Sequence, residues 1–88
     1  MREASIERKI VNVIKSKGGL CLKWVSPGFT GVPDRIAILP RGKILFIEVK
    51  KPGTGRLAER QKRVADLLRQ LGCIVITADS LEDLNGYI

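Results

Sequence analysis

The sequence predicts one α/β domain, spanning residues 1–88, in which helices flank a mixed β-sheet and the elements follow the order αβββαβ. Two long segments repeat apolar residues at helical spacing, and four shorter apolar runs have the length of β-strands. The last of these runs follows the second helix in a β-α-β crossover, so it should pair in parallel with the strand before that helix.

The composition favours a folded and strongly basic domain. Hydrophobic residues make up 44% of the chain, and the formal net charge is +7. Such a charge is typical of proteins that bind nucleic acid or another anionic surface, although it also suits a well-solvated surface. No apolar run approaches the roughly 18 residues of a membrane span, so no membrane partner and an intracellular location are expected.

The chain contains no histidine. This absence excludes a Ser-His-Asp triad, Cys₂His₂ zinc fingers and any reaction that depends on a histidine base. Acid–base chemistry must therefore use lysine, carboxylates or water bound to a metal. The two cysteines, Cys21 and Cys73, each lie in an apolar run, so reduced and buried thiols are expected.

Residues 2–17 are expected to form the first helix, which Gly18 and Gly19 end. The apolar stripe of this helix consists of Ile6, Ile10, Val13 and Ile14. Glu7 borders the stripe, and an acid near the start of a helix also suits the helix dipole. Lys9 belongs to the basic residues that lie mostly on the other side.

The next three strands are expected at residues 20–26, 36–39 and 44–49. Both faces of the third of these strands are apolar, which is typical of a central strand covered on both sides. The loop before it consists of Pro40, Arg41 and Gly42. These residues suit a three-residue hairpin loop, with a type I turn closed by a glycine at positive φ.

This loop sets the pairing of the hairpin. Leu39 then faces Lys43, and counting outward in pairs places Asp34 opposite Glu48, unless a bulge at the glycine shifts the register by one residue. Directly opposed residues have Cβ atoms roughly 4.5–5.5 Å apart. Glu48 and Lys50 share a face because they are two residues apart. We therefore expect two carboxylates and a lysine to converge at the end of an apolar strand.

Carboxylates are rarely buried unless they are paired or bound to a metal, so this convergence needs an explanation. One interpretation is a structural ion pair that joins Lys50 to Asp34 or Glu48. The other is a divalent-metal site, because two carboxylates, water and a phosphate together suit Mg²⁺.

The order of these motifs resembles a known family. Pro33-Asp34 followed by Glu48-Val49-Lys50 is the pattern of the PD-(D/E)XK nucleases. A wider set resembles the VRR-NUC domain, the virus-type replication-repair nuclease family: Gly31-Val32-Pro33-Asp34-Arg35, Phe46-Ile47-Glu48-Val49-Lys50, Pro52-Gly53-Thr54-Gly55-Arg56-Leu57 and Gln61. The ordered set is far more specific than an isolated Glu-x-Lys, and it covers nearly the whole chain, as in stand-alone phage and bacterial members.

The resemblance implies a minimal restriction-endonuclease-like core and a metal-dependent DNA endonuclease. Asp34 and Glu48 are expected to hold Mg²⁺ or Mn²⁺, together with the Val49 carbonyl and water. Glu7 is expected to assist directly or through water. Lys50 is expected to orient the nucleophile or to stabilise charge on the phosphate.

The second half of the chain completes the expected fold. Residues 57–71 should form the second helix, with an apolar stripe of Leu57, Val64, Leu67, Leu68 and Leu71. Gln61 lies on this stripe, and the resemblance implies that it supports the active site. Residues 73–78 should form the last strand, and Ser80 to Asp83 is typical of a cap that opens a final short helix.

Basic residues near the expected site are candidates for DNA contact. They are Lys51 and Arg56 in the loop after the third strand, Arg35 beside Asp34, and Lys9 on the first helix. The resemblance implies branched DNA such as a Holliday junction as substrate, a homodimer, and action in the bacterial cytoplasm or a phage-infected host cell. The alternative is a catalytically silent DNA-binding or regulatory module of a replication complex.

Overall fold

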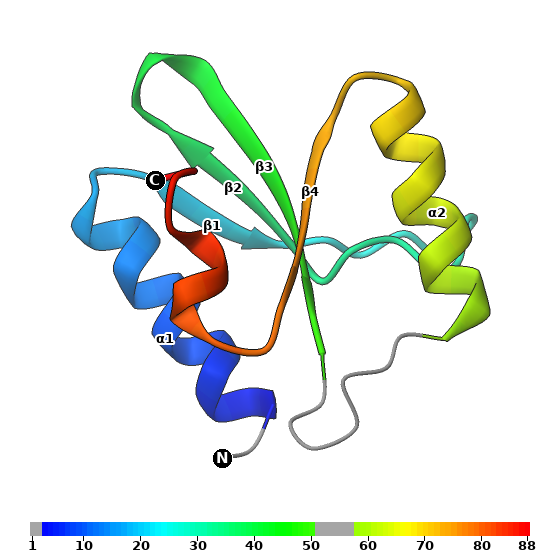
Figure 1. The fold of residues 1–88 in the computed structure, drawn as a ribbon, viewed down its shortest axis with the longest axis horizontal. Coiled ribbons are helices and arrows are strands. Elements are labelled where there is room, and N and C mark those ends of the chain that lie inside the picture. The colour runs from blue at the N-terminus through cyan, green and yellow to red at the C-terminus, as the bar shows by residue number, and fades with distance from the viewer. Residues whose placement is uncertain (1–2, 51–57) are drawn as a thin grey trace.

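The structure is a computed structural model of the chain, and it describes residues 3–50 and 58–88 (Figure 1). The elements are α1 (Glu3–Ser16), β1 (Leu20–Lys23), β2 (Arg35–Leu39), β3 (Lys43–Val49), α2 (Glu59–Gln70) and β4 (Ile74–Ala78). Two short 3₁₀ turns, η1 (Pro40–Gly42) and η2 (Leu81–Leu84), complete the chain. The predicted order αβββαβ is confirmed.

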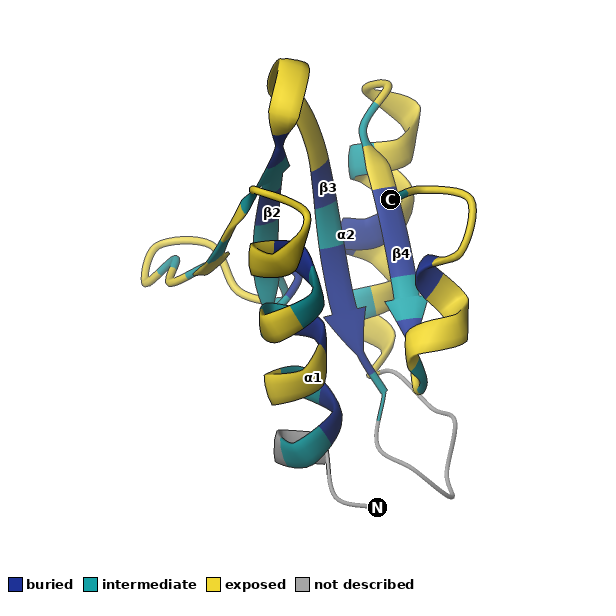
Figure 2. Cartoon of the chain, turned by 90° about the vertical axis from the view of Figure 1, so that its left-hand side faces the viewer, coloured by how far each residue is buried: buried dark blue, intermediate teal, exposed yellow. Residues whose placement is uncertain are grey.

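The four strands form one mixed sheet in the order β1-β2-β3-β4. The first two pairs are antiparallel, whereas β3 and β4 are parallel, as the crossover through α2 requires. Helix α1 and η2 lie against one face of the sheet, and α2 lies on the other face beside β4 (Figures 1 and 2). The predicted α/β class with helices flanking a mixed sheet is therefore confirmed.

The core lies between α1 and the sheet. Ile6, Ile10 and Ile14 are at most 3% exposed and pack on alternate residues of β2 and β3, including Ala37 and Ile47. Fully burying such a side chain stabilises the fold by roughly 1.5–3 kcal/mol. The apolar stripe predicted for the first helix therefore forms the main core.

The hairpin pairs in the predicted register. Leu39 faces Lys43, and the ladder continues to the pair of Arg35 and Ile47. The turn differs from the expected type I turn, because Arg41 takes φ 70° as well as Gly42 at φ 74°. Proline suits the second position of both type I and type II turns, so the sequence did not distinguish them.

Strand β1 is shorter than predicted. It ends at Lys23 rather than at residue 26. The Trp24 N–H still donates to the Asp34 carbonyl (3.0 Å), but the Ser26 carbonyl then accepts a hydrogen bond from Phe29 N–H (3.4 Å). This turn takes the chain off the sheet and into the loop that leads to Asp34.

The stripe predicted for the second helix is only partly correct. Val64 and Ala65 are buried against the sheet, whereas Leu67 is 46% exposed and Leu71 is 74% exposed. Helix α2 packs over β4, which is an edge strand, so the far side of the stripe extends beyond the sheet. Leu57 lies outside the described residues.

The face of the sheet on which α2 lies remains open where α2 does not reach. Leu20 and Leu22 of β1 and Ile44 of β3 are between 46% and 59% exposed on this face. Beside them, the rings of Trp24 and Phe46 lie 5.2 Å apart between centroids. In the described part of the chain, no helix is long and apolar enough to cross a membrane.

Both cysteines are free thiols, as predicted, although each is only half-buried. Burial raises the pKa of the Cys21 thiol, and the charge of Arg35 partly opposes this shift. A raised pKa leaves the thiol protonated and poorly reactive, which fits a packing role.

Candidate active site

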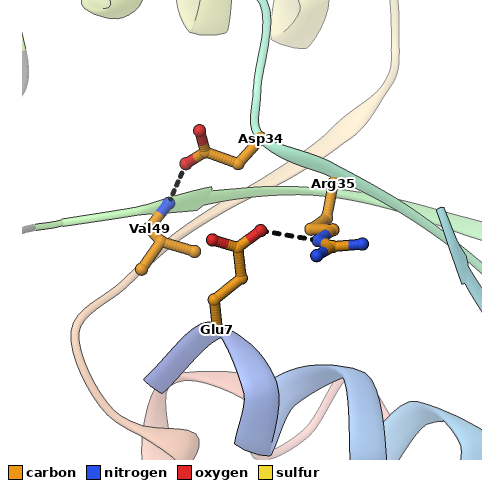
Figure 3. Close-up of polar contacts among 4 residues, drawn as sticks. All are labelled: Glu7, Asp34, Arg35 and Val49. Carbon is orange, nitrogen blue, oxygen red and sulfur yellow. Dashed lines mark hydrogen bonds and ion pairs between the residues drawn. The ribbon is translucent and has the colours of Figure 1, made fainter. Parts of the chain in front are cut away.

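Asp34 is fixed at the open end of the hairpin, immediately before β2. Its Oδ2 accepts a hydrogen bond from the Val49 N–H (2.8 Å), and its carbonyl accepts one from the Trp24 N–H (3.0 Å). One step beyond the last described pair, Arg35 with Ile47, the register places Asp34 opposite Glu48. Figure 3 shows the Asp34 carboxylate directed at the end of β3.

Glu48 is completely buried in β3 (0% exposed), on the face that α2 covers. The Gln61 side-chain amide donates a hydrogen bond to Glu48 Oε1 (2.7 Å). The Gln61 Oε1 accepts a hydrogen bond from the Ala58 N–H (3.1 Å), which is the glutamine half of a capping box at the start of α2, whereas Ala58 has no side-chain oxygen to supply the other half. Gln61 thus joins the first turn of the helix to a carboxylate that could not remain buried without hydrogen bonds.

The first turn of α2 also fixes the loop before Asp34. Arg60 Nε donates to the Thr30 carbonyl (3.2 Å), and its guanidinium lies 5.0 Å from the centre of the Phe29 ring. Gly31 has φ +86°, and a Cβ at this position would lie 2.6 Å from Arg60 Cγ. Arg60 can therefore pack here only against glycine.

Sequence reasoning missed Arg60, although its neighbour Gln61 was identified. The sequence does contain both parts of this contact, Gly31 before Asp34 and Arg60 at the start of α2, but only the structure shows that they pack against each other.

Glu7 and Arg35 lie on the α1 side of this end of the sheet, and they bind each other. Arg35 Nε donates to Glu7 Oε2 (2.7 Å), and both side chains are about one-fifth exposed. Figure 3 shows the Glu7 carboxylate reaching from α1 toward Asp34 and Val49. The sequence assigned Glu7 to metal and Arg35 to DNA, and the ion pair between them was not anticipated.

Lys50 directly follows β3, and its N–H donates to the Ala78 carbonyl (2.8 Å). Within residues 3–50 and 58–88, no ion pair joins Lys50 to Asp34. The Lys50 charge instead contributes slightly to the lowered pKa of Asp83, whose main cause is a hydrogen bond from the Asp79 backbone.

The donors at this end of β3 fit a hard divalent cation. Asp34 and Glu48 supply carboxylate oxygens, and the carbonyl of Val49 directly follows Glu48 in the chain. In the part of the chain that is described, no three His, Cys, Asp or Glu side chains lie close enough to hold a metal alone. Backbone, water and substrate phosphate would complete the shell, as they commonly do for Mg²⁺.

The predicted DNA contacts are only partly visible. Lys51 and Arg56 lie outside the described residues. Lys9 is exposed on α1, where it lines a hollow of about 220 Å³ with Asp79 and Glu82. Arg35 follows Asp34 in the chain, and its ion pair with Glu7 keeps its side chain at the same end of the sheet as Asp34.

Comparison with known proteins identifies the family. The VRR-NUC domain matches residues 2–81 of this chain. "Putative nuclease p44" of Acyrthosiphon pisum secondary endosymbiont phage 1 is 44% identical over 88 residues, covering 100% of this chain and 92% of that protein. A solved "VRR_NUC domain" superposes with a TM-score of 0.87 at 31% identity, covering 94% of this chain and 89% of the other. These similarities support a nuclease activity on DNA, and the chain belongs to the VRR-NUC domain family.

Proposed function

We propose that this protein is a metal-dependent DNA endonuclease that hydrolyses phosphodiester bonds in branched DNA. Its family supports the nuclease activity. The observation that carries the metal site is the hairpin register, which sets Asp34 opposite Glu48 when it is continued one step beyond the pair of Arg35 and Ile47. One carboxylate is held by the Val49 N–H and the other by the Gln61 amide.

Each residue of the site has a role in this proposal. Asp34 and Glu48 hold Mg²⁺ or Mn²⁺ with the Val49 carbonyl, and Glu7 assists directly or through water. Such an ion lowers the pKa of water and neutralises charge on the phosphate. Lys50 orients the attacking water or stabilises the negative charge that develops on the phosphate.

Gln61 has a positioning role. Its amide holds one oxygen of Glu48 and so fixes the rotation of the carboxylate about its last bond. A site held to within a fraction of an ångström supports catalysis far better than a loose one. Gln61 needs no contact with the DNA for this role.

The substrate and the assembly belong to the same proposal. An uncovered apolar face of the sheet, with Leu20 and Leu22 of β1 and Ile44 of β3 exposed, supports a two-fold homodimer. Two sites related by a two-fold axis could cut two strands of a Holliday junction symmetrically. The phage origin of one relative is in line with action inside a bacterial or phage-infected cell.

Cleavage of labelled four-way junction, flap and linear duplex DNA tests the proposal. Each substrate is incubated with Mg²⁺, with Mn²⁺ and with EDTA, using wild type, Glu48→Gln and Lys50→Ala. Glu59→Gln is the matched control, because Glu59 is exposed on the same helix that carries Gln61. Metal-dependent cutting that both site variants lose and the control keeps supports the nuclease. Tight DNA binding without cutting under any condition would instead support the silent binding module.

A further inference from the structure

A groove lies between α1 and the edge strand β1, next to the candidate active site. It has a volume of about 320 Å³ and is lined by Glu7, Arg8, Val11, Lys23 and Arg35. Three of these side chains are basic and one is acidic, so the lining carries a net positive charge. A groove with such a charge attracts anions of matching size.

The basic side chains come from three different elements, which the fold brings together. Lys23 is the direct partner of Arg35 in the pairing of β1 with β2, so both side chains lie on the face that α1 covers. Arg8 follows Glu7 on α1, and Glu7 binds Arg35. The groove therefore continues directly from the Glu7–Arg35 ion pair.

Arg35 connects the groove to the active site. Only its Nε is bonded to Glu7, at 2.7 Å. A guanidinium has five N–H donors, so its terminal nitrogens can still bind a second oxygen ligand. Asp34 is its neighbour in the chain and already lies at the end of β3. An anion that binds Arg35 in the groove is thus held by the residue next in sequence to Asp34, which belongs to the proposed metal site.

We propose that this groove binds a backbone phosphate of the DNA strand, one that flanks the phosphate to be cut. This inference rests on the proposed function, since it takes Asp34 as the cutting centre. The Lys23 ammonium attracts the phosphate as a compact positive charge, and the Arg8 guanidinium can donate two parallel hydrogen bonds to its oxygens. Arg35 contributes the N–H groups of its terminal nitrogens. Glu7 keeps Arg35 oriented, so the ion pair aligns the bound strand with the carboxylates.

Salt-dependent DNA binding tests the groove without any need for cutting. A short labelled duplex is titrated with the full chain in EDTA, and its anisotropy is followed over a series of salt concentrations. The variants are Lys23→Ala, Arg8→Ala and Lys23→Arg. Lys43→Ala is the matched control, because Lys43 is an exposed lysine at the opposite end of the hairpin.

Loss of one phosphate contact lowers the slope of log K against log salt by about 0.9, which corresponds to roughly eightfold weaker binding at about 0.1 M salt. We expect this loss for Lys23→Ala and Arg8→Ala, wild-type behaviour for Lys43→Ala, and recovery of the slope in Lys23→Arg. Equal melting temperatures of all variants exclude a general effect on folding. Equal slopes in Lys23→Ala and Lys43→Ala would overturn the inference.

The groove and the nuclease activity can fail separately. If wild type cuts DNA in Mg²⁺ but Lys23→Ala leaves the slope of log K against log salt unchanged, the phosphate-binding groove is refuted and the nuclease proposal stands. A reduced slope in a protein that never cuts upholds the groove and removes the nuclease proposal. Lys23-dependent stabilisation by inorganic phosphate, with no change in the DNA slope, would show a small-anion site and also overturn the inference.

Discussion

Replacing Gln61 by alanine should destabilise the fold, because it removes a hydrogen bond to the buried carboxylate of Glu48. Glu48 is 0% exposed, and the Gln61 amide donates to it at 2.7 Å. A hydrogen bond to a charged group contributes roughly 1.5–3 kcal/mol to stability. The same substitution removes the hydrogen bond from the Ala58 N–H to Gln61 Oε1, and a neutral hydrogen bond of this kind contributes about 0.5–1.5 kcal/mol.

The expected total is therefore about 2–4 kcal/mol, which is a large share of the roughly 5–15 kcal/mol that hold a typical domain folded. In a domain of this size, each kcal/mol lowers the melting temperature by about 4–8 °C. Thermal unfolding followed by circular dichroism measures this shift. Gln70→Ala is the matched control, since Gln70 is exposed at the other end of α2.

The reasoning also predicts the behaviour of a charged substitute. Gln61→Glu keeps the size of the side chain but places a second carboxylate against buried Glu48, so it should destabilise more than alanine at neutral pH. Lowering the pH should reverse part of that difference, because one of the two carboxyls then takes up a proton. Melting temperatures of Gln61→Ala and Gln70→Ala that agree within error would refute the proposed link between α2 and Glu48.

Four further outcomes are expected. Gly31→Ala should cost about 1–3 kcal/mol in urea unfolding, because φ +86° disfavours a side chain and the new Cβ would meet Arg60, whereas Gly28→Ala should be nearly neutral since its Cβ meets nothing within 4 Å. Mg²⁺ or Mn²⁺ at a hundred times the Kd should stabilise wild type by about 2.7 kcal/mol and so raise its melting temperature, but should not raise that of Asp34→Asn; equal melting curves with and without metal would count against the site. Leu22→Lys should convert a dimer to a monomer in sedimentation equilibrium, while Leu67→Lys, with the same 46% exposure on α2, should leave it unchanged; a wild-type monomer would contradict the open-face interface. The pKa of Asp83 is lowered, mainly by the hydrogen bond from the Asp79 backbone, so the stabilisation that the Asp83 carboxylate contributes is present above pH 3.8 and is lost as the pH falls below it. In a series of melting temperatures against pH, Asp83→Asn should therefore reduce the loss of stability at acid pH, whereas Glu82→Gln should not.

The parts of the fold that the sequence predicted well depend on local interactions. The stripe of Ile6, Ile10 and Ile14 repeats within one helix, and the hairpin register follows from three loop residues. Because that register is local, the approach of Asp34 to the end of β3 could be counted out along the chain. The detailed turn type could not, since proline permits more than one.

The parts that the sequence did not predict depend on how distant elements pack. Glu7 and Arg35 are 28 positions apart, and they meet only because α1 crosses the sheet at a particular place. Lys23 joins them through the pairing of β1 with β2, and the eleven-residue loop between these strands hides that register from the sequence. The exposure of Leu67 and Leu71 follows from the position of α2 over an edge strand, which periodicity alone does not reveal.

The two faces of the sheet divide the work of the proposed site. On the α2 face, Gln61 and Arg60 hold Glu48 and the loop before Asp34, so the carboxylates are rigid before any substrate arrives. On the α1 face, the Glu7–Arg35 pair is partly exposed and opens into a basic groove. If the proposed metal site and the proposed phosphate groove are both correct, DNA would be captured through charge on the α1 face and aligned without moving the carboxylates. Substitutions in the groove should therefore weaken binding, whereas substitutions at the start of α2 should weaken the chemical step and stability together.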